Sequence, residues 1–162
     1  MAHLTLILGG ARSGKSRRAL ALCPAPRCFI ATAEPLDAEM ADRIAHHRAE
    51  RGPDWTTVEA PLDLAGVVAR EAGEGRSLLV DCLTLWLSNV MHHERAPGAE
   101  TARLLAALAQ APGRAVLVSN EVGMGLAPMN ALGRAFRDAQ GRLNQEVAAA
   151  ADRVEFVAAG LP

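Results

Sequence analysis

Short apolar runs alternate along this chain with longer segments in which apolar positions recur every three or four residues. The runs are apolar at nearly every position, which is typical of strands that helices cover on both faces. Strands are predicted at 4–8, 28–32, 78–80, 115–118 and 154–158, with a weaker one at 55–59. Helices are predicted at 15–22, 36–51, 62–72, 83–92, 99–110 and 131–151.

This order predicts an α/β fold with three layers, in which helices cover both faces of a mostly parallel sheet through right-handed crossovers. The chain shows no internal repeat and no linker, so residues 1–162 are expected to form one domain. Residues 94–99 and 120–130 are rich in Gly, Pro and polar side chains, and they are predicted to be loops, the first of them mobile.

Ligands of such folds bind beyond the carboxyl ends of the strands. Polar or glycine-rich positions follow five of the predicted strands. They are residues 9–16, Thr32, Glu59, Asp81 and Asn120 with its neighbour. The strand assignments therefore place five candidate groups at one edge of the sheet.

The strongest motif is Gly9-Gly10-Ala11-Arg12-Ser13-Gly14-Lys15-Ser16, which follows a predicted strand and opens a predicted helix. Its glycines allow backbone N–H groups to surround phosphate oxygens at the positive end of a helix. Lys15 is the only lysine beside sixteen arginines, which indicates a position that needs a compact ammonium. A nucleotide phosphate is the first ligand to propose, the alternative being a glycine-rich turn.

Asp81 ends an apolar strand, and such an acid commonly accompanies a phosphate loop. With Ser16 it would hold Mg²⁺, directly or through water, although any buried strand can end in Asp. Glu59 ends the weaker strand, where its carboxylate could accept hydrogen bonds from guanine or remain solvated. The segment 119–125 could line an acceptor site or only form a loop.

Two adjacent histidines lie in the helix predicted at 36–51. Leu36, Met40 and Ile44 form an apolar stripe that His47 continues, whereas His46 lies off that stripe, one turn before Glu50. From the residues alone, one packed and one solvated histidine is a more ordinary interpretation than a nucleophile.

Composition excludes several classes of protein. The formal net charge is −1 and the chain has no basic stripe, which argues against nucleic acid as a partner. Cys23, Cys28 and Cys82 have no metal-binding spacing, and we expect a reducing cytoplasm. No apolar stretch reaches the length of a membrane span, and the apolar start is too short for a signal peptide.

Five segments occur in an order that resembles the bifunctional adenosylcobinamide kinase / adenosylcobinamide-phosphate guanylyltransferases of cobalamin biosynthesis. They are the phosphate loop, Asp37-x-Glu39-Met40 to His46-His47, Asn120-Glu121-Val122-Gly123-Met124-Gly125, Phe136-Arg137-Asp138 and Gly141-Arg142-x-Asn144-Gln145. The resemblance covers nearly the whole chain. It implies a phosphate-loop NTPase fold similar to the recombinase (RecA-like) ATPases, and a homotrimer.

The resemblance also implies two reactions. ATP or GTP phosphorylates the aminopropanol hydroxyl of adenosylcobinamide. GTP then guanylylates an enzyme histidine, and the GMP passes to adenosylcobinamide phosphate to give adenosylcobinamide-GDP. The nucleophile falls on His46, with His47 as the fallback, and a neutral imidazole suits this role near pH 7.

Beyond the phosphate loop, the resemblance implies further nucleotide contacts. These fall on Ala31, Thr32, Ala33, His47, Arg48, Glu50, Glu59 and Asp81. Two other classes stay open on the residues alone. One is a phosphate-loop kinase for a different metabolite, in which His46 has no role. The other is a GTP-dependent switch that transfers nothing.

Overall fold

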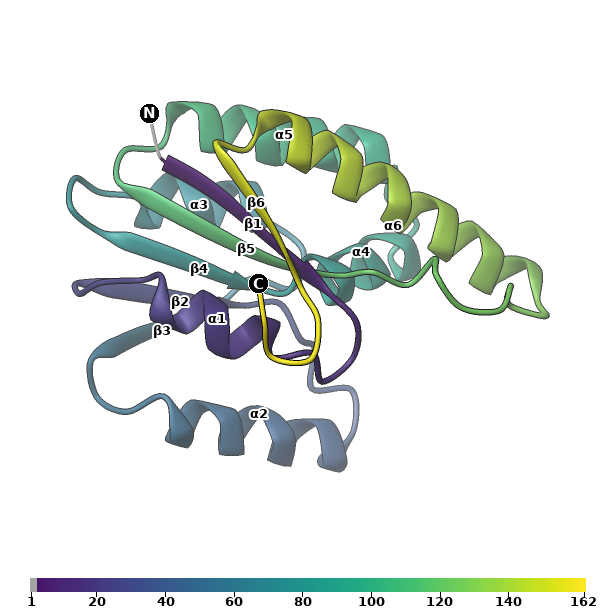
Figure 1. Cartoon of the computed structure of the whole chain (residues 1–162), viewed down its shortest axis with the longest axis horizontal. Helices are drawn as coiled ribbons and strands as arrows, with labels where there is room; N and C mark the ends of the chain where they lie inside the picture. Colours follow the sequence, from purple (N-terminus) through teal and green to yellow (C-terminus); the bar gives the residue numbers. More distant parts are fainter. Residues whose placement is uncertain (1–2) are drawn as a thin grey trace.

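The computed structural model describes residues 3–162, which form six strands and six helices (Figure 1). The strands are β1 (His3–Gly9), β2 (Arg27–Ala31), β3 (Trp55–Glu59), β4 (Ser77–Asp81), β5 (Arg114–Asn120) and β6 (Arg153–Val157). The helices are α1 (Lys15–Ala21), α2 (Ala38–Glu50), α3 (Leu64–Glu71), α4 (Leu83–His92), α5 (Pro97–Gln110) and α6 (Ala131–Ala150). The strands pair throughout in parallel, in the order β3-β2-β4-β5-β1-β6, so the predicted α/β fold is confirmed.

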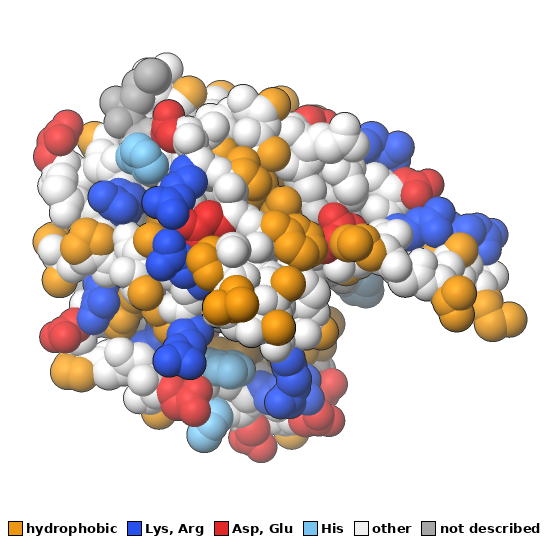
Figure 2. Space-filling view, in the orientation of Figure 1, with side chains coloured by type: hydrophobic (Ala, Val, Ile, Leu, Met, Phe, Trp, Pro, Cys, Tyr) orange, Lys and Arg blue, Asp and Glu red, His pale blue; other side chains and the backbone are white. Residues whose placement is uncertain are grey.

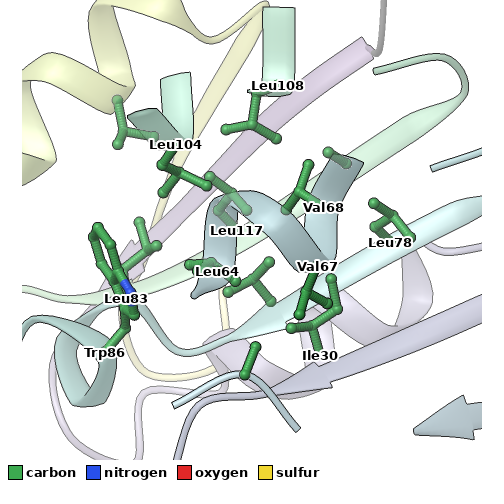
Figure 3. Close-up of a cluster of buried hydrophobic side chains, with 14 of the residues drawn as sticks. Ile30, Leu64, Val67, Val68, Leu78, Leu83, Trp86, Leu104, Leu108 and Leu117 are labelled. Carbon is green, nitrogen blue, oxygen red and sulfur yellow. The ribbon is translucent and has the colours of Figure 1, made fainter. Parts of the chain in front are cut away.

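Side chains alternate between the two faces of the sheet, as in any strand. Leu6, Ile30 and Leu117 belong to the larger core, which α3, α4, α5 and α6 cover (Figure 3). Ile7 and Val116 belong to the smaller core beneath α1. The three predicted layers are therefore confirmed, and both faces of the central strands are buried as their continuous apolar runs require.

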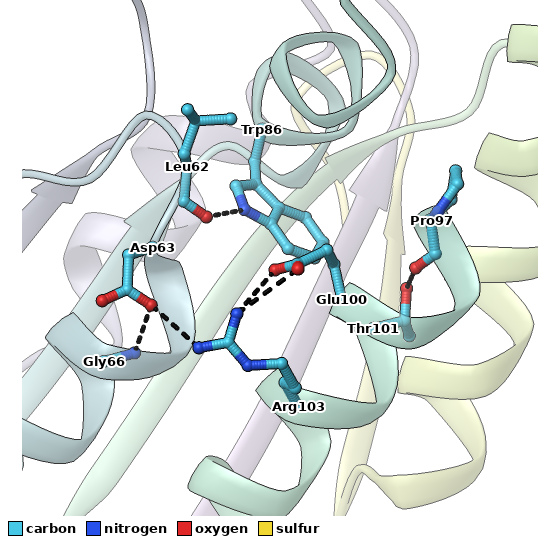
Figure 4. Close-up of polar contacts among 8 residues, drawn as sticks. All are labelled: Leu62, Asp63, Gly66, Trp86, Pro97, Glu100, Thr101 and Arg103. Carbon is cyan, nitrogen blue, oxygen red and sulfur yellow. Dashed lines mark hydrogen bonds and ion pairs between the residues drawn. The ribbon is translucent and has the colours of Figure 1, made fainter. Parts of the chain in front are cut away.

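The helices of the larger core are also joined by polar contacts (Figure 4). The indole Nε1 of Trp86 in α4 donates to the carbonyl oxygen of Leu62 at 3.0 Å. Arg103 in α5 pairs with Glu100 in its own helix and with Asp63, which precedes α3. These contacts hold α3, α4 and α5 as one unit behind the sheet.

The mobile loop predicted at 94–99 is wrong in its second half. The helix α5 already begins at Pro97, and Thr101 Oγ1 donates to the Pro97 carbonyl oxygen at 2.8 Å. Proline suits the first turn of a helix, because its missing N–H has no partner there and its φ is already helical. At this position proline therefore begins a helix rather than ending one.

The helix α2 lies apart from the other elements, beyond α1 and the β3 edge of the sheet (Figure 1). It begins two residues later than predicted, because Asp37 caps it by accepting a hydrogen bond from the Met40 backbone N–H at 2.7 Å. None of its residues from Ala38 to Glu50 is buried. Its apolar stripe at Met40 and Ile44 is only half-buried.

The predicted loop at 120–130 is confirmed from residue 121 onward, while Asn120 ends β5. This loop and the first turns of α6 extend from the body of the structure as an arm (Figure 1). Hydrophobic side chains gather at its tip, where Leu126 and Met129 are fully exposed (Figure 2). Within residues 3–162, no helix has the length and apolar character needed to cross a bilayer.

Candidate nucleotide-binding and transfer site

The phosphate loop makes close backbone contacts that exclude side chains at two of its glycines. A Cβ on Gly9 would lie 2.5 Å from Ser13 Oγ and 2.7 Å from the Val157 carbonyl oxygen. Gly14, which precedes α1, has φ +94°, a conformation that glycine adopts without the steric cost of a Cβ. The loop is therefore held in a compact turn directly before the helix N-terminus.

Lys15 is the first residue of α1, and its side chain turns back over the loop. Its Nζ donates to the Gly10 carbonyl oxygen at 2.9 Å. Ser16 follows on the exposed side of the same turn. The ammonium, the helix N-terminus and the loop N–H groups thus occupy one small region, which is the arrangement that binds phosphate in such loops.

Asp81 lies at the end of β4, near Lys15 and Ser16. Burial raises the pKa of its carboxyl, and the Ser16 hydroxyl and the charges of Lys15, His47 and Arg51 partly offset that rise. A half-buried carboxylate beside a serine hydroxyl fits the donor set that Mg²⁺ uses in phosphate-loop enzymes, since oxygen is its preferred ligand. The structure thus brings Asp81 and the phosphate loop together, as the strand pattern predicted.

The strand register places two other predicted residues beside Asp81. Ala31 in β2 is paired with Asp81 in β4 on one side and with Glu59 in β3 on the other. Glu59 is exposed, so its carboxylate is free to accept from a ligand. Ala31, Glu59 and Asp81 therefore form a row across the carboxyl edge of the sheet.

Thr32, which is expected to line the nucleotide, lies directly after β2. Its side chain is fully buried, and its hydroxyl donates to the Cys82 carbonyl oxygen at 2.7 Å and accepts from the Cys82 N–H at 2.9 Å. Asn89 also donates to the Thr32 carbonyl oxygen at 2.7 Å. Thr32 therefore holds the backbone that follows Asp81, and any effect on a nucleotide passes through that backbone.

The two histidines of α2 share one carboxylate. His46 Nε2 lies 3.1 Å from Glu50 Oε1, and His47 Nδ1 lies 3.5 Å from Glu50 Oε2. The His46 side chain is 74% exposed. His47 is the one of the two whose charge lowers the pKa of Asp81, which agrees with its place on the stripe that faces the sheet. Arg48 is exposed beside them, and Ala33 is half-buried before the helix.

Two features near the loop were not predicted. The Gly160 backbone N–H donates to the Ser13 carbonyl oxygen at 2.7 Å, so the turn after β6 supports the phosphate loop. Arg51, the C-cap of α2, lies close enough to Asp81 to affect its pKa. No local sequence pattern indicated that the Gly160 turn contacts the loop. Arg51 could have been found in the sequence, because it continues the stripe of Met40, Ile44 and His47.

These features define a phosphate-loop nucleotide-binding α/β protein, with an acid next to the loop and a histidine-bearing helix close enough to that acid for His47 to affect its pKa. The comparison with protein families agrees and is more specific. Residues 5–162 match the family "Cobinamide kinase / cobinamide phosphate guanyltransferase". The chain belongs to this family, and it is an enzyme with both kinase and guanylyltransferase activity.

Relatives of similar length support the assignment. The bifunctional adenosylcobalamin biosynthesis protein CobP of Pseudomonas aeruginosa is 50% identical over 97% of this chain and 94% of its own length. The corresponding CobU proteins of Salmonella typhimurium and Escherichia coli are 41% and 40% identical, over 98% of this chain and 97% of theirs. The resemblance noted in the sequence is therefore confirmed over nearly the whole chain.

Proposed function

We propose that this enzyme acts in adenosylcobalamin biosynthesis through a covalent GMP-histidine intermediate, with His46 as the nucleophile. The observation that carries the proposal is that His47 and Arg51 of the α2 segment lie close enough to Asp81, beside the phosphate loop, for their charges to affect its pKa. When the loop holds the β- and γ-phosphates, the α-phosphate lies on the side of β1 and β2, the strands that precede α2. The exposed imidazole of His46 is available to attack there.

In the kinase step, the aminopropanol hydroxyl oxygen of adenosylcobinamide attacks the γ-phosphorus of ATP or GTP and loses its proton. The nucleoside diphosphate leaves with the electron pair of the broken P–O bond. Lys15 exchanges its hydrogen bond to Gly10 for the phosphate oxygens and neutralises their charge. Positioning and electrostatics supply most of the catalysis in such a transfer.

In the guanylyl step, an imidazole nitrogen attacks the α-phosphorus of GTP and pyrophosphate leaves. A phosphate oxygen of adenosylcobinamide phosphate then attacks the same phosphorus, which frees the histidine and gives adenosylcobinamide-GDP. The proposal assigns guanine to Glu59, and further nucleotide contacts to Ala31, Thr32 through its backbone, Ala33, His47, Arg48 and Glu50. Ser16 and Asp81 would hold Mg²⁺, which would neutralise charge on the phosphates when bound.

The test uses purified enzyme and GTP labelled at the α-phosphate. We expect label on the denatured protein that survives base and is lost in acid, as for a phosphoramidate. His46→Ala should abolish this label and retain measurable kinase activity, while His47→Ala, which alters the neighbouring imidazole on the same carboxylate, should still be labelled. Label retained in His46→Ala and lost in His47→Ala would move the nucleophile by one residue. An unlabelled wild type would remove the covalent intermediate.

We also propose that the enzyme is a cytoplasmic homotrimer in which each chain is one nucleotide-binding domain. The exposed apolar tip of the arm supports association, because large exposed apolar clusters commonly mark contact surfaces. Sedimentation equilibrium measures the mass directly. A monomer at micromolar concentration would contradict the proposal, and Met129→Asp should then have no effect on mass.

A further inference from the structure

Arg51 lies where α2 returns to the sheet, and it stacks on an aromatic ring. Its guanidinium carbon is 3.6 Å from the centroid of the Phe29 ring in β2. Its Nη2 reaches Thr57 Oγ1 in β3 only at 3.5 Å. The ring therefore fixes the plane of the guanidinium, while most of its N–H donors remain unused.

Among residues 3–162, no carboxylate lies within ion-pair distance of the guanidinium, and the charge of Asp81 acts on it only from farther away. Its Nε is buried without a hydrogen bond. Burial lowers the pKa of Arg51. Arg27 is a useful comparison: its guanidinium carbon lies 4.7 Å from the Trp55 centroid and its Nε is also buried without a hydrogen bond, but it pairs with Asp54 at 3.7 Å. A partly desolvated charge without a partner is costly, and a bound anion would remove that cost.

The place of Arg51 indicates which anion it would meet. Phe29 and Thr57, its two contacts, lie two residues before Ala31 and Glu59 in the same strands. Residues two apart in a strand share a face, so Arg51 lies on the face of the sheet that carries the Ala31, Glu59 and Asp81 row. The charge of Asp81 acts on Arg51 as well. Arg51 therefore lies on the face of the sheet that carries the proposed nucleotide site, two residues before the ends of β2 and β3.

We propose that Arg51 binds the α-phosphate of GTP and stabilises the charge that develops on it during guanylyl transfer. This inference rests on the proposed covalent mechanism. The loop and Lys15 account for the β- and γ-phosphates, and none of the other proposed nucleotide contacts has been assigned to the α-phosphate. As the N–P bond forms and the P–O bond to pyrophosphate breaks, negative charge gathers on the non-bridging oxygens. Arg51 stays protonated throughout and offers two parallel N–H donors to them.

The experiment measures the single-turnover rate of GMP labelling and, separately, the rate of γ-phosphate transfer to adenosylcobinamide. Arg51→Met keeps an unbranched side chain over Phe29 but removes the charge. We expect labelling to slow about 100-fold, the effect of losing one donor to a developing oxyanion, and the kinase rate to change less than about threefold. The control is Arg43→Met on the exposed side of the same helix, where Arg43 pairs with Glu39 at 3.4 Å. It should leave both rates unchanged.

Two further measurements separate this role from a structural one. Added guanidinium at millimolar concentration should restore part of the labelling rate in Arg51→Ala, which a mere packing defect would not allow. Arg51→Lys should be labelled at an intermediate rate, because it keeps the positive charge but loses the paired N–H donors of the planar guanidinium. This variant also tests the inference if the uncharged variants do not fold. Equal loss of both activities with a lowered melting temperature, or unchanged labelling, would overturn the inference. Absence of label in the wild type would instead overturn the covalent mechanism.

Discussion

The phosphate loop and the helix α2, to which we assign the two halves of the chemistry, are held in opposite ways. The loop is enclosed by β1, by the Gly160 turn and by α1, which Arg18 joins to Glu155 in β6. The helix α2 buries none of its residues, and its histidines are exposed. Binding phosphate requires N–H groups that are already in place, whereas a histidine that is guanylylated and then discharged must meet two different partners.

The contrast has an energetic basis. Moving the loop would break buried backbone contacts, so its geometry exists before the nucleotide arrives. Moving α2 would expose little apolar surface, since its stripe is only half-buried, and the free energy that opposes such a movement is small. We therefore expect substitutions around the loop to affect stability and both reactions, and substitutions on α2 to affect guanylyl transfer alone.

The largest effect is expected for Lys15→Ala. The loop would lose the ammonium that neutralises the β- and γ-phosphates, so both reactions should fall by about 10³-fold or more. Arg17→Ala, on the exposed side of α1, is the matched control and should retain both activities. Kinase and GMP-labelling rates measured on the same preparations test this. Guanylylation that persisted at the wild-type rate would place GTP elsewhere.

A second prediction concerns the backbone of the loop. Gly9→Ala places a Cβ against Ser13 Oγ and the Val157 carbonyl oxygen, and this overpacking should lower the free energy of unfolding by about 1–3 kcal/mol. Gly10→Ala is the control, because a Cβ there has no atom within 4 Å. Urea denaturation without nucleotide compares the two. Equal stability of both variants would show that the loop is less tightly enclosed than the contacts indicate.

A third prediction uses pH to test the link between α1 and β6. Arg18 Nε and Nη2 donate to the two Glu155 oxygens at 2.8 and 3.0 Å, and they lower the pKa of that carboxyl. The stabilisation is therefore present above the ordinary glutamate pKa and is lost as pH falls through the lowered value. At pH 7, Glu155→Gln should melt a few degrees below the wild type, and the gap should close in acid.

The control for that measurement is Glu74→Gln, an exposed position between α3 and β4. It should melt like the wild type at every pH. A gap for Glu155→Gln that stays constant from pH 7 down to pH 3 would mean that packing, rather than the ionised carboxylate, joins these two elements.

The smallest effect is expected on α2. Ile44→Ala removes the apolar side chain at the centre of the stripe, but the site is only half-buried, so we expect a loss below about 1 kcal/mol. Ile7→Ala in the core beneath α1 should cost about 2–5 kcal/mol, because Ile7 is completely buried. Chemical denaturation of both variants gives the difference. Similar losses would mean that α2 packs as firmly as the loop.

Much of the fold and part of the site could be predicted. Continuous apolar runs marked the strands, and the helix α4 was predicted with its observed bounds, because period and length are local properties. The phosphate loop and Asp81 were predicted to meet, because parallel strands bring their carboxyl ends to one edge. Pro97 was predicted to belong to a loop, but it begins α5, because proline is common both at the start of helices and just beyond their ends.

Other parts of the site depend on contacts between distant residues. Thr32 follows a strand and has a polar side chain, which is what the sequence offers for a residue that lines a ligand. Its hydroxyl forms hydrogen bonds with the backbone of Cys82, fifty residues away in the chain. The Gly160 turn meets Ser13 from the other end of the chain. Arg51 continues the stripe of α2 in the sequence, but the case for its role depends on its surroundings, namely Phe29 beneath it and no carboxylate within residues 3–162 that forms an ion pair with it.

The sequence by itself determined the class of protein, the order of its elements and the family to which it belongs. These follow from the spacing of glycines, apolar runs and charged residues over short distances, where each residue constrains its neighbours directly. Only the tertiary structure decided how firmly each half of the chemistry is held: a loop enclosed from three sides, and a helix with no buried residue between Ala38 and Glu50. Burial and pairing depend on every element that approaches a side chain, and no local pattern contains that information.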